Sequence, residues 1–261
     1  KSFIIDHLKQ THSSNMGDFS GLFVETSDAH SYSVIVKLSS KFGDGDKMTF
    51  DGISKFELKY VHGLLYSLSY KDEHSNNIPI YTGVSTYNFY YDDNKRVALI
   101  EFLDVNGKKQ IVSDGYSSIL FIYGDNNNPK LPSDTYYLNL PESFMTECSA
   151  HKDVAEFSKR ALKYSVKHLE GNYGYKSVYD SYGCEIERVF CDKSGKECCL
   201  YEGFSRIKLE KTVNDDLLSI SYFKSEMPVI NNESVHKIVF SYASNGTGYS
   251  CKYLDCNGNP T

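Results

Sequence analysis

The segment Thr49–Leu58 (TFDGISKFEL) is matched 151 positions later by Leu200–Leu209 (LYEGFSRIKL). Glycine aligns with glycine, serine with serine, Asp51 with Glu202 and Lys55 with Arg206, whereas Glu57 aligns with the oppositely charged Lys208. Two further pairs follow in the same order near the same offset: Leu65–Tyr70 (LYSLSY) with Leu217–Tyr222 (LLSISY), and Phe102–Gly107 (FLDVNG) with Tyr253–Gly258 (YLDCNG). Three matches in order indicate an internal duplication.

The duplication predicts two homologous modules, residues 1–147 and residues 148–261. Each length suits a domain with its own hydrophobic core. The first module continues beyond its Asn106-Gly107 turn, whereas the second stops three residues after Asn257-Gly258. We therefore expect the second module to lack the closing strands of the first, as in a segment taken from a longer chain.

Short runs of alternating polar and apolar residues predict β-strands, separated by polar turn segments. Asn106-Gly107 predicts a type I′ hairpin turn, because both residues tolerate positive φ. In the first module the predicted strands are Tyr32–Leu38, Lys47–Phe50, Lys55–Tyr60, Leu64–Tyr70, Ile78–Tyr81, Ser85–Tyr91, Val97–Leu103, Gln110–Val112 and Ser118–Tyr123.

Apolar residues at helical spacing in His151–Leu169 predict a helix, and Phe3–Gln10 predicts its counterpart in the first module. The expected fold is therefore mainly β, of the α+β class. It consists of two tandem homologous modules, each an antiparallel sheet or sandwich with one N-terminal helix.

The formal charge of −6 is concentrated in the first module. Residues 1–147 contain 13 Lys and Arg against 19 Asp and Glu, whereas residues 148–261 contain 15 of each. An acidic surface disfavours nucleic acid and anionic membranes as partners. No apolar run approaches the roughly 20 residues of a membrane span. We expect a basic protein partner, no nucleic acid and no membrane insertion of this fragment.

All seven cysteines lie between Cys148 and Cys256. This density favours an oxidising compartment and predicts structural disulfides, with connectivity open and one thiol left over. The spacings lack the C-x-x-C pair that is typical of zinc sites, so no metal or other cofactor is predicted. The disulfide candidates are Cys184, Cys191, Cys198, Cys199, Cys251 and Cys256.

The sequence contains no phosphate-binding loop, nucleophile elbow or zinc-binding helix. It therefore predicts a protein that is not an enzyme, with no catalytic residue. Recognition is expected on the loops Asp72–Asn77, Asp92–Lys95 and Asp125–Asp134. The predicted ligand-binding residues are Asp72, Glu73, Tyr90, Asp92, Asp93 and Asp125.

Two alternatives stay open at this point. Abundant tyrosine is compatible with a carbohydrate- or lipid-binding module in which exposed rings stack on a sugar. A hydrolase whose site is assembled from distant residues is the other alternative.

One stretch resembles a known family. Tyr60-x-His62-x-Leu64-Leu65-x5-Lys71-Asp72 is followed by Tyr87-x-x-Tyr90 and by Val97–Phe102 (VALIEF). This pattern is similar to the tandem modules of a secreted and surface protein family of the piroplasm parasites Theileria and Babesia, loosely related to FAINT-type repeats. It covers residues 50–107 and, more weakly, 201–258. The resemblance implies a secreted or cell-surface antigen that binds a host protein, in immune evasion or adhesion, without catalysis.

Overall fold

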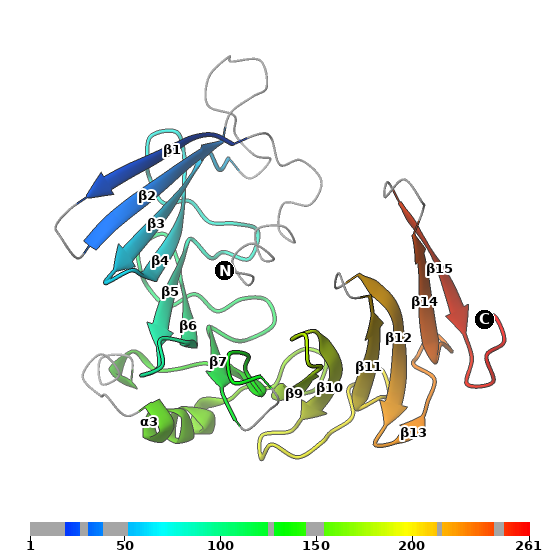
Figure 1. The fold of residues 1–261 in the computed structure, drawn as a ribbon. Coiled ribbons are helices and arrows are strands. Elements are labelled where there is room, and N and C mark those ends of the chain that lie inside the picture. The colour runs from blue at the N-terminus through cyan, green and yellow to red at the C-terminus, as the bar shows by residue number, and fades with distance from the viewer. Residues whose placement is uncertain are drawn as a thin grey trace. The chain divides into compact units, whose positions relative to one another are not determined.

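The computed structural model describes residues 19–26, 31–38, 52–124, 128–144, 154–212, 216–242 and 248–261. The protein is mainly β, with 47% strand and 6% helix, and its paired strands are antiparallel (Figure 1). The predicted strand Lys47–Phe50 and the predicted helix Phe3–Gln10 lie outside the described residues. No described helix is long and apolar enough to cross a membrane.

The chain divides into two compact units. Unit 1 comprises Lys1–Tyr91 and Ile100–Ser113, and unit 2 comprises Asp92–Leu99 and Asp114–Thr261. In unit 1, successive strands pair with their neighbours in chain order, and β3 and β4 are joined by the tight turn His62-Gly63. The strands of this part are β1 (Phe19–Thr26), β2 (Ser31–Leu38), β3 (Lys55–Val61), β4 (Leu64–Lys71) and β5 (Thr86–Tyr91), followed by β6 (Val97–Leu103), which the division crosses.

Unit 2 continues the same up-and-down order, except that the short β13 pairs with β12, and β12 then pairs with β14. Its elements are β7 (Ser118–Ile122), β8 (Asp134–Leu138), the helix α3 (Val154–Ala161), a 3₁₀ turn (Leu162–Tyr164), β9 (Gly174–Tyr179), β10 (Glu185–Cys191), β11 (Arg206–Lys211), β12 (Leu217–Lys224), β13 (Met227–Pro228), β14 (Lys237–Tyr242) and β15 (Tyr249–Leu254).

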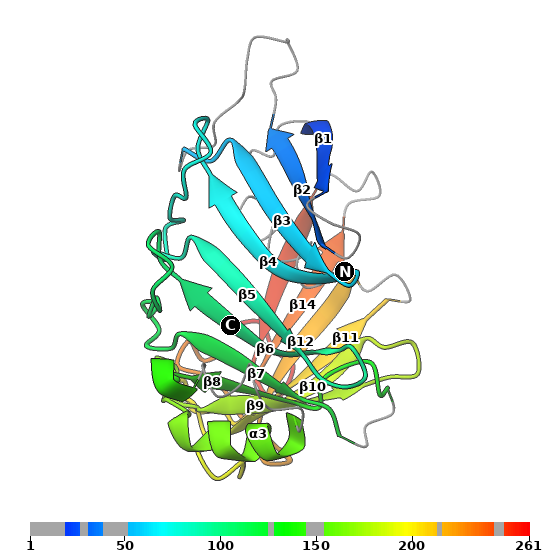
Figure 2. The same cartoon turned by 90° about the vertical axis from the view of Figure 1, so that its left-hand side faces the viewer.

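The helix α3 lies between β8 and β9 in the sequence, although these two strands pair directly in the sheet (Figure 2). The aromatic ring of Phe144 packs against those of Phe157 in α3 and Tyr164 in the 3₁₀ turn. The predicted helical run to Leu169 is wrong in its second half, because His168 and Leu169 lie in a hydrogen-bonded turn. That turn satisfies the backbone groups that a longer helix would have paired.

One type of turn recurs throughout the described residues. The N–H of its first residue donates to the carbonyl of the fifth, and the N–H of the fourth donates to the carbonyl of the first. The fourth residue has positive φ, as in a type I turn followed by a left-handed residue. Ten turns with all of these features begin at Asp72, Ile80, Asp92, Asp104, His168, Asp180, Asp192, Leu200, Asn231 and Asp255.

The predicted type I′ turn at Asn106-Gly107 is wrong, since it belongs to the turn that begins at Asp104 and only Gly107 has positive φ, at 72°. The turn with two consecutive left-handed residues is instead His62-Gly63, where φ is 50° and 77°. A type I′ turn requires both of its central residues in this region.

Aspartate occupies the first position of six of these turns, each directly after a strand. In every one, the Oδ1 atom accepts the N–H of the fifth residue at 2.7–3.0 Å. In the turn that begins at Asp104, the backbone hydrogen bond from Lys108 is the largest of the effects that hold the pKa of this carboxyl below its ordinary value. The carboxylate therefore acts as a structural part of the turn.

The hydrogen bonds also define a repeat that is shorter than the offset between the sequence matches. After each hairpin the chain returns to the start of the next one through what we call a return segment, for example Asp72–Ser85 and Asp192–Ser205. Six equivalent N–H groups each bond to the carbonyl of the last residue of a hairpin strand, or of the second-to-last residue in β12, at 2.8–2.9 Å. The pairs are Ser54 to Lys71, Ser85 to Leu103, Ser117 to Leu138, Tyr173 to Cys191, Ser205 to Phe223 and His236 to Leu254.

Successive donors are separated by nearly equal lengths of chain, except for the longer step from Ser117 to Tyr173, which contains α3. Ser54 and Ser205 are therefore four steps apart, as are Tyr70 and Tyr222. All three sequence matches fall on equivalent positions of this shorter repeat. The division into modules 1–147 and 148–261 stays a prediction, because a repeat of single hairpins accounts for the same matches.

The return segments cover the apolar face of the hairpins. In unit 1, the rings of Phe56, Tyr70, Tyr87 and Phe102 form an edge-to-face series with centroid distances of 5.7, 6.1 and 5.2 Å. In unit 2, Leu200 and Phe204 of a return segment pack with Phe190 of β10. Phe190 is therefore buried under the return segment that follows its hairpin, and the rings of unit 1 are buried against one another.

This arrangement explains two wrong strand predictions, Ile78–Tyr81 and Gln110–Val112. Both lie in return segments, where Ile78 and Gln110 donate single hydrogen bonds to Tyr70 and Phe102. Their apolar side chains supply core packing, so alternation arises there without a strand.

We expect opposite stability changes at equivalent turn positions. The substitution Lys95→Gly should stabilise the protein by about 0.5–1 kcal/mol, because Lys95 has φ of 60°, which favours glycine. The substitution Gly107→Ala should destabilise it by about 1–2 kcal/mol through backbone strain alone, since no atom lies within 4 Å of the added Cβ. Denaturant unfolding measures both, and changes of the same sign would contradict the left-handed geometry.

Candidate binding surface

The predicted acidic ligand-binding residues fall into two groups. Asp72 and Asp92 are the first residues of turns and accept backbone hydrogen bonds from Asn76 and Arg96. The side chain of Asp92 also pairs with the Arg96 guanidinium at 2.6 Å. Both carboxylates are therefore engaged within the protein. Glu73 and Asp93 are exposed on the same turns, and Asp125 lies outside the described residues.

Tyr90 is half-buried on β5, and its hydroxyl donates to Glu101 Oε2 at 2.9 Å. Burial, followed by the negative charge of Glu101, raises the pKa of Tyr90 well above its ordinary value. Glu101 also accepts a hydrogen bond from the Asn88 amide at 3.3 Å. Tyr90 lies near the end of β5, Asp92 and Asp93 lie in the turn that directly follows that strand, and Glu73 lies in the turn that follows β4.

No disulfide links any two of the six described cysteines, so the predicted disulfide framework is not present among them. Cys191 and Cys251 lie on strands opposite Gly174 and Phe240, so neither has a cysteine as its cross-strand partner. Burial raises the pKa of the Cys191 thiol to about 11, and its Sγ contacts the Val189 carbonyl at 3.5 Å. Such a thiol is a poor nucleophile at neutral pH.

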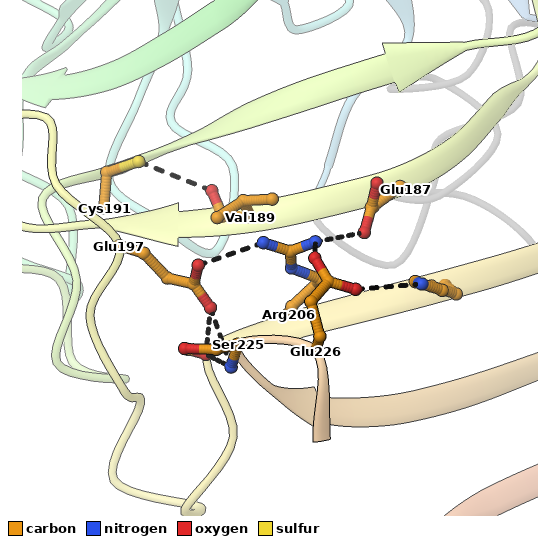
Figure 3. A network of polar contacts seen from close by, with 9 residues as sticks. Glu187, Val189, Cys191, Glu197, Arg206, Ser225 and Glu226 are labelled. Atoms are coloured by element: carbon orange, nitrogen blue, oxygen red, sulfur yellow. Dashed lines mark hydrogen bonds and ion pairs between the residues drawn. The ribbon is translucent and has the colours of Figure 1, made fainter. Parts of the chain in front are cut away.

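The densest charge network surrounds Arg206 at the start of β11 (Figure 3). Its guanidinium binds Glu187 of β10 at 2.9 Å, Glu197 of the preceding return segment at 3.0 Å, and Glu226 of the turn after β12. Figure 3 shows Glu187 and Glu197 approaching it from opposite sides. The Arg206 side chain is only 15% exposed. One cation therefore joins three separate segments of the repeat.

Glu197 is the most constrained of these carboxylates. Burial alone would raise its pKa, but hydrogen bonds from the Ser205 hydroxyl and from Arg206 outweigh burial and hold the pKa below its ordinary value. Glu197 also accepts the backbone N–H of Ser225 at 3.0 Å. Apart from Arg206 Nε, which is buried without a hydrogen-bond partner, the guanidinium nitrogens and the Glu197 carboxylate are engaged within the protein, so this network is suited to fixing the sheet rather than to binding a ligand.

A different surface of unit 2 carries exposed side chains on a fixed backbone. Three equivalent turns of successive repeats lie side by side, since the Tyr201 N–H donates to the Glu170 carbonyl at 2.9 Å and the Asn232 amide donates to the Tyr201 carbonyl at 3.2 Å. We call this surface the turn row. It consists of residues 168–171, 200–203 and 231–234.

The turn row presents one acidic and one mixed line of side chains. The third residue of each turn is an exposed glutamate, Glu170, Glu202 or Glu233. The second residue is Leu169, Tyr201 or Asn232, and the first two of these are 63% and 65% exposed. Lys167 lies over the Tyr201 ring at 4.9 Å. The row thus combines three carboxylates with two large apolar groups.

Sequence reasoning missed this surface, although a signal was present. Glu170-Gly171, Glu202-Gly203 and Glu233-Ser234 recur at nearly equal intervals along the chain. Each match is only two residues long, so it can be recognised as a repeat only once the hairpin repeat is known.

No group of His, Cys, Asp and Glu side chains in the described ranges is arranged to hold a metal ion. The chain matches no known protein-family model and no curated protein.

Replacing Arg206 should be costly. We expect Arg206→Met to lower the free energy of unfolding by about 2–3 kcal/mol, because it leaves three carboxylates without their shared cation. Lys208→Met is the matched control on the same strand. It removes the same charge from a side chain that is 44% exposed and should cost less than about 1 kcal/mol. Equal losses in denaturant unfolding would show that Arg206 has no special role.

The lowered pKa of Glu197 predicts acid sensitivity. A carboxyl whose pKa is lower in the folded state contributes stability that is fully present above the unfolded-state pKa, near 4.5, and is lost as the pH falls through the folded-state pKa. We expect Glu197→Gln to be less stable than the wild type at pH 7, with a smaller further loss below about pH 4.5. Thermal unfolding from pH 3 to pH 7 measures this difference, and parallel curves for the two proteins would contradict it.

Proposed function

We propose that the protein is a non-enzymatic binding protein that acts outside the cell and uses the turn row to bind a basic segment of another protein. The observation that carries the proposal is the placement of Glu170, Glu202 and Glu233 at one register beside exposed Leu169 and Tyr201. Following the family resemblance, the expected partner is a host protein.

The chemistry of the row supports such a partner. Aligned carboxylates attract Lys and Arg side chains and accelerate encounter, whereas tyrosine and leucine supply the apolar contact that slows dissociation. The hydrogen bonds between neighbouring turns, one from the Tyr201 N–H and one from the Asn232 side-chain amide, hold these groups in place before binding, which lowers the entropic cost of association.

The test begins with capture of partners from host plasma and cell-surface extract, identified by mass spectrometry. The captured protein is then measured against a variant carrying Glu170→Gln, Glu202→Gln and Glu233→Gln. We expect its association rate to fall about tenfold at low salt, because electrostatic steering is lost. Tyr201→Ala should act mainly by increasing the dissociation rate.

The matched control carries Glu73→Gln and Asp93→Asn, which remove exposed carboxylates from the loops that the sequence favoured. This variant should bind as the wild type does. Binding that is lost in the control but retained in the turn-row variant would place recognition on those loops instead.

Exposed tyrosines at other turns favour a second candidate, a carbohydrate-binding module. Tyr81 and Tyr182 are among the most exposed aromatic residues described, and such rings can stack on sugars. A glycan array separates the two proposals. A sugar signal that Tyr81→Ala or Tyr182→Ala removes, with no captured protein partner, would favour carbohydrate.

A further inference from the structure

The side chain of Glu101 in β6 carries a charge that no cation of the described residues balances. It is only 9% exposed and lies in unit 1. Glu101 Oε2 accepts the Tyr90 hydroxyl at 2.9 Å and the Asn88 amide at 3.3 Å, but within the described part of the chain Oε1 accepts no hydrogen bond and the carboxylate has no ion pair. A buried charge without a counter-ion is costly, because burial removes its hydration.

The fold does not require an acidic residue at this position. The carbonyl of Phe102, the residue after Glu101, accepts an N–H from its return segment, as the carbonyls of Tyr70, Phe190 and Tyr222 do in theirs. The residues that precede these three are Ser69, Val189 and Ser221. Neutral side chains therefore serve the same hairpin position, and the charge of Glu101 is not part of the repeat.

The lysines of β3 and β4, in the same unit, are engaged elsewhere. Lys59 of β3 and Lys71 of β4 both pair with Glu57, at 3.6 and 3.1 Å. Lys55 Nζ, also in β3, donates to the carbonyl of Glu73 at 2.6 Å. These cations would have to leave their present partners to reach Glu101, so β3 and β4 do not supply its counter-ion.

Polar and aromatic groups lie beside the carboxylate. Ser67 of β4 is opposite Asn88, so its side chain shares that face of the sheet, and it is 4% exposed. The pairing of β3 with β4 skips Tyr66, which is therefore the extra residue of a β-bulge and is 48% exposed. Burial and Glu101 have the largest effects on the raised pKa of Tyr90, and Tyr66 is close enough to contribute to it. The carboxylate thus has a hydroxyl and two tyrosine rings around it.

We propose that Glu101 is the anionic centre of a site that binds a primary alkylammonium group, carried by a free amine or by the lysine side chain of another protein. Glu101 Oε1 accepts one ammonium N–H, and the Ser67 hydroxyl accepts a second. The Tyr66 ring covers the alkyl chain and attracts the cation. The bound group supplies the counter-ion that the described part of the chain lacks.

The hydrogen bonds favour ammonium over other cations. A guanidinium binds a carboxylate best through both oxygens, and Glu101 Oε2 already accepts two hydrogen bonds. Ca²⁺ and Mg²⁺ require about six oxygen ligands, and no group of His, Cys, Asp and Glu in the described ranges is arranged to hold a metal ion. This site belongs to unit 1 and the turn row to unit 2, so each proposal can fail without the other.

The probes are butylammonium chloride and the methylamide of acetylated lysine, each titrated at constant ionic strength into the intact, isotope-labelled chain and followed by NMR. We expect saturable shifts of the Asn88 side-chain amide, with a dissociation constant on the order of 1–10 mM for so small a ligand. Butylguanidinium chloride should bind at least about threefold more weakly. Tighter binding of the lysine derivative than of butylammonium would identify a protein lysine as the natural group, and the reverse order would identify a free amine.

Two variants test the role of the charge. Glu101→Gln keeps the shape of the side chain and an oxygen for the Tyr90 hydroxyl, but it removes the charge. It should abolish saturable binding and raise the thermal unfolding midpoint by about 2–4 °C, because the unbalanced buried charge is gone. Glu73→Gln, the matched control, removes an exposed carboxylate from the same unit and should change neither quantity.

The absence of saturable shifts in the wild type would overturn the proposal, as would binding that persists in Glu101→Gln. Tighter binding of butylguanidinium than of butylammonium would contradict the choice of cation. A midpoint that falls in Glu101→Gln would assign the carboxylate a structural role, like that of Glu197, and would also overturn the site.

Discussion

The described sheet depends on one recurring constraint, the closure of six strand ends by a turn whose fourth residue is left-handed. Six strands end immediately before an aspartate, and the side chain of that aspartate accepts the N–H that returns at the fifth residue. Where the turn joins two neighbouring strands, as after Asp92 and Asp180, it sets the loop length and therefore the register, and the register decides which side chains face the core. Every later feature inherits its position from this local geometry.

A repeated turn gives a repeated fold. Each hairpin cannot bury its own aromatic face, and the return segment that follows supplies the missing cover. The three sequence matches arise from this repeat, because each of them compares two positions that are separated by four hairpin repeats. The similarity is strongest there because these segments retain both the turn residues and the apolar residues beside them. Intervening repeats preserve the geometry with less similar residues, such as Asn172-Tyr173 in place of Ile53-Ser54.

The charged side chains of unit 2 fall into two groups. Some are paired within the fold, and others are exposed and available to bind a partner. Asp92 closes a turn and binds Arg96, and the three carboxylates around Arg206 join separate segments. Neither set can serve a partner without loss of structure. The glutamates of the turn row are exposed, and of the three only Glu170 lies near a charged group of its own turn, with Oε2 3.7 Å from His168 Nδ1. This difference, rather than the density of acidic residues, separates a binding surface from a structural network.

The sequence by itself determined the β class and most strands, because alternation of side chains and turn chemistry are local properties of the chain. Lys55–Tyr60, Leu64–Tyr70, Ser85–Tyr91 and Val97–Leu103 were predictable to within a single position at each end for this reason. Only the tertiary structure decided that Ile78–Tyr81 belongs to a return segment and not to a strand. It also decided that Arg206 binds carboxylates from three segments and that turns of successive repeats form one row. These features arise from hydrogen bonds and packing between residues distant in sequence, for which the local pattern carries no signal.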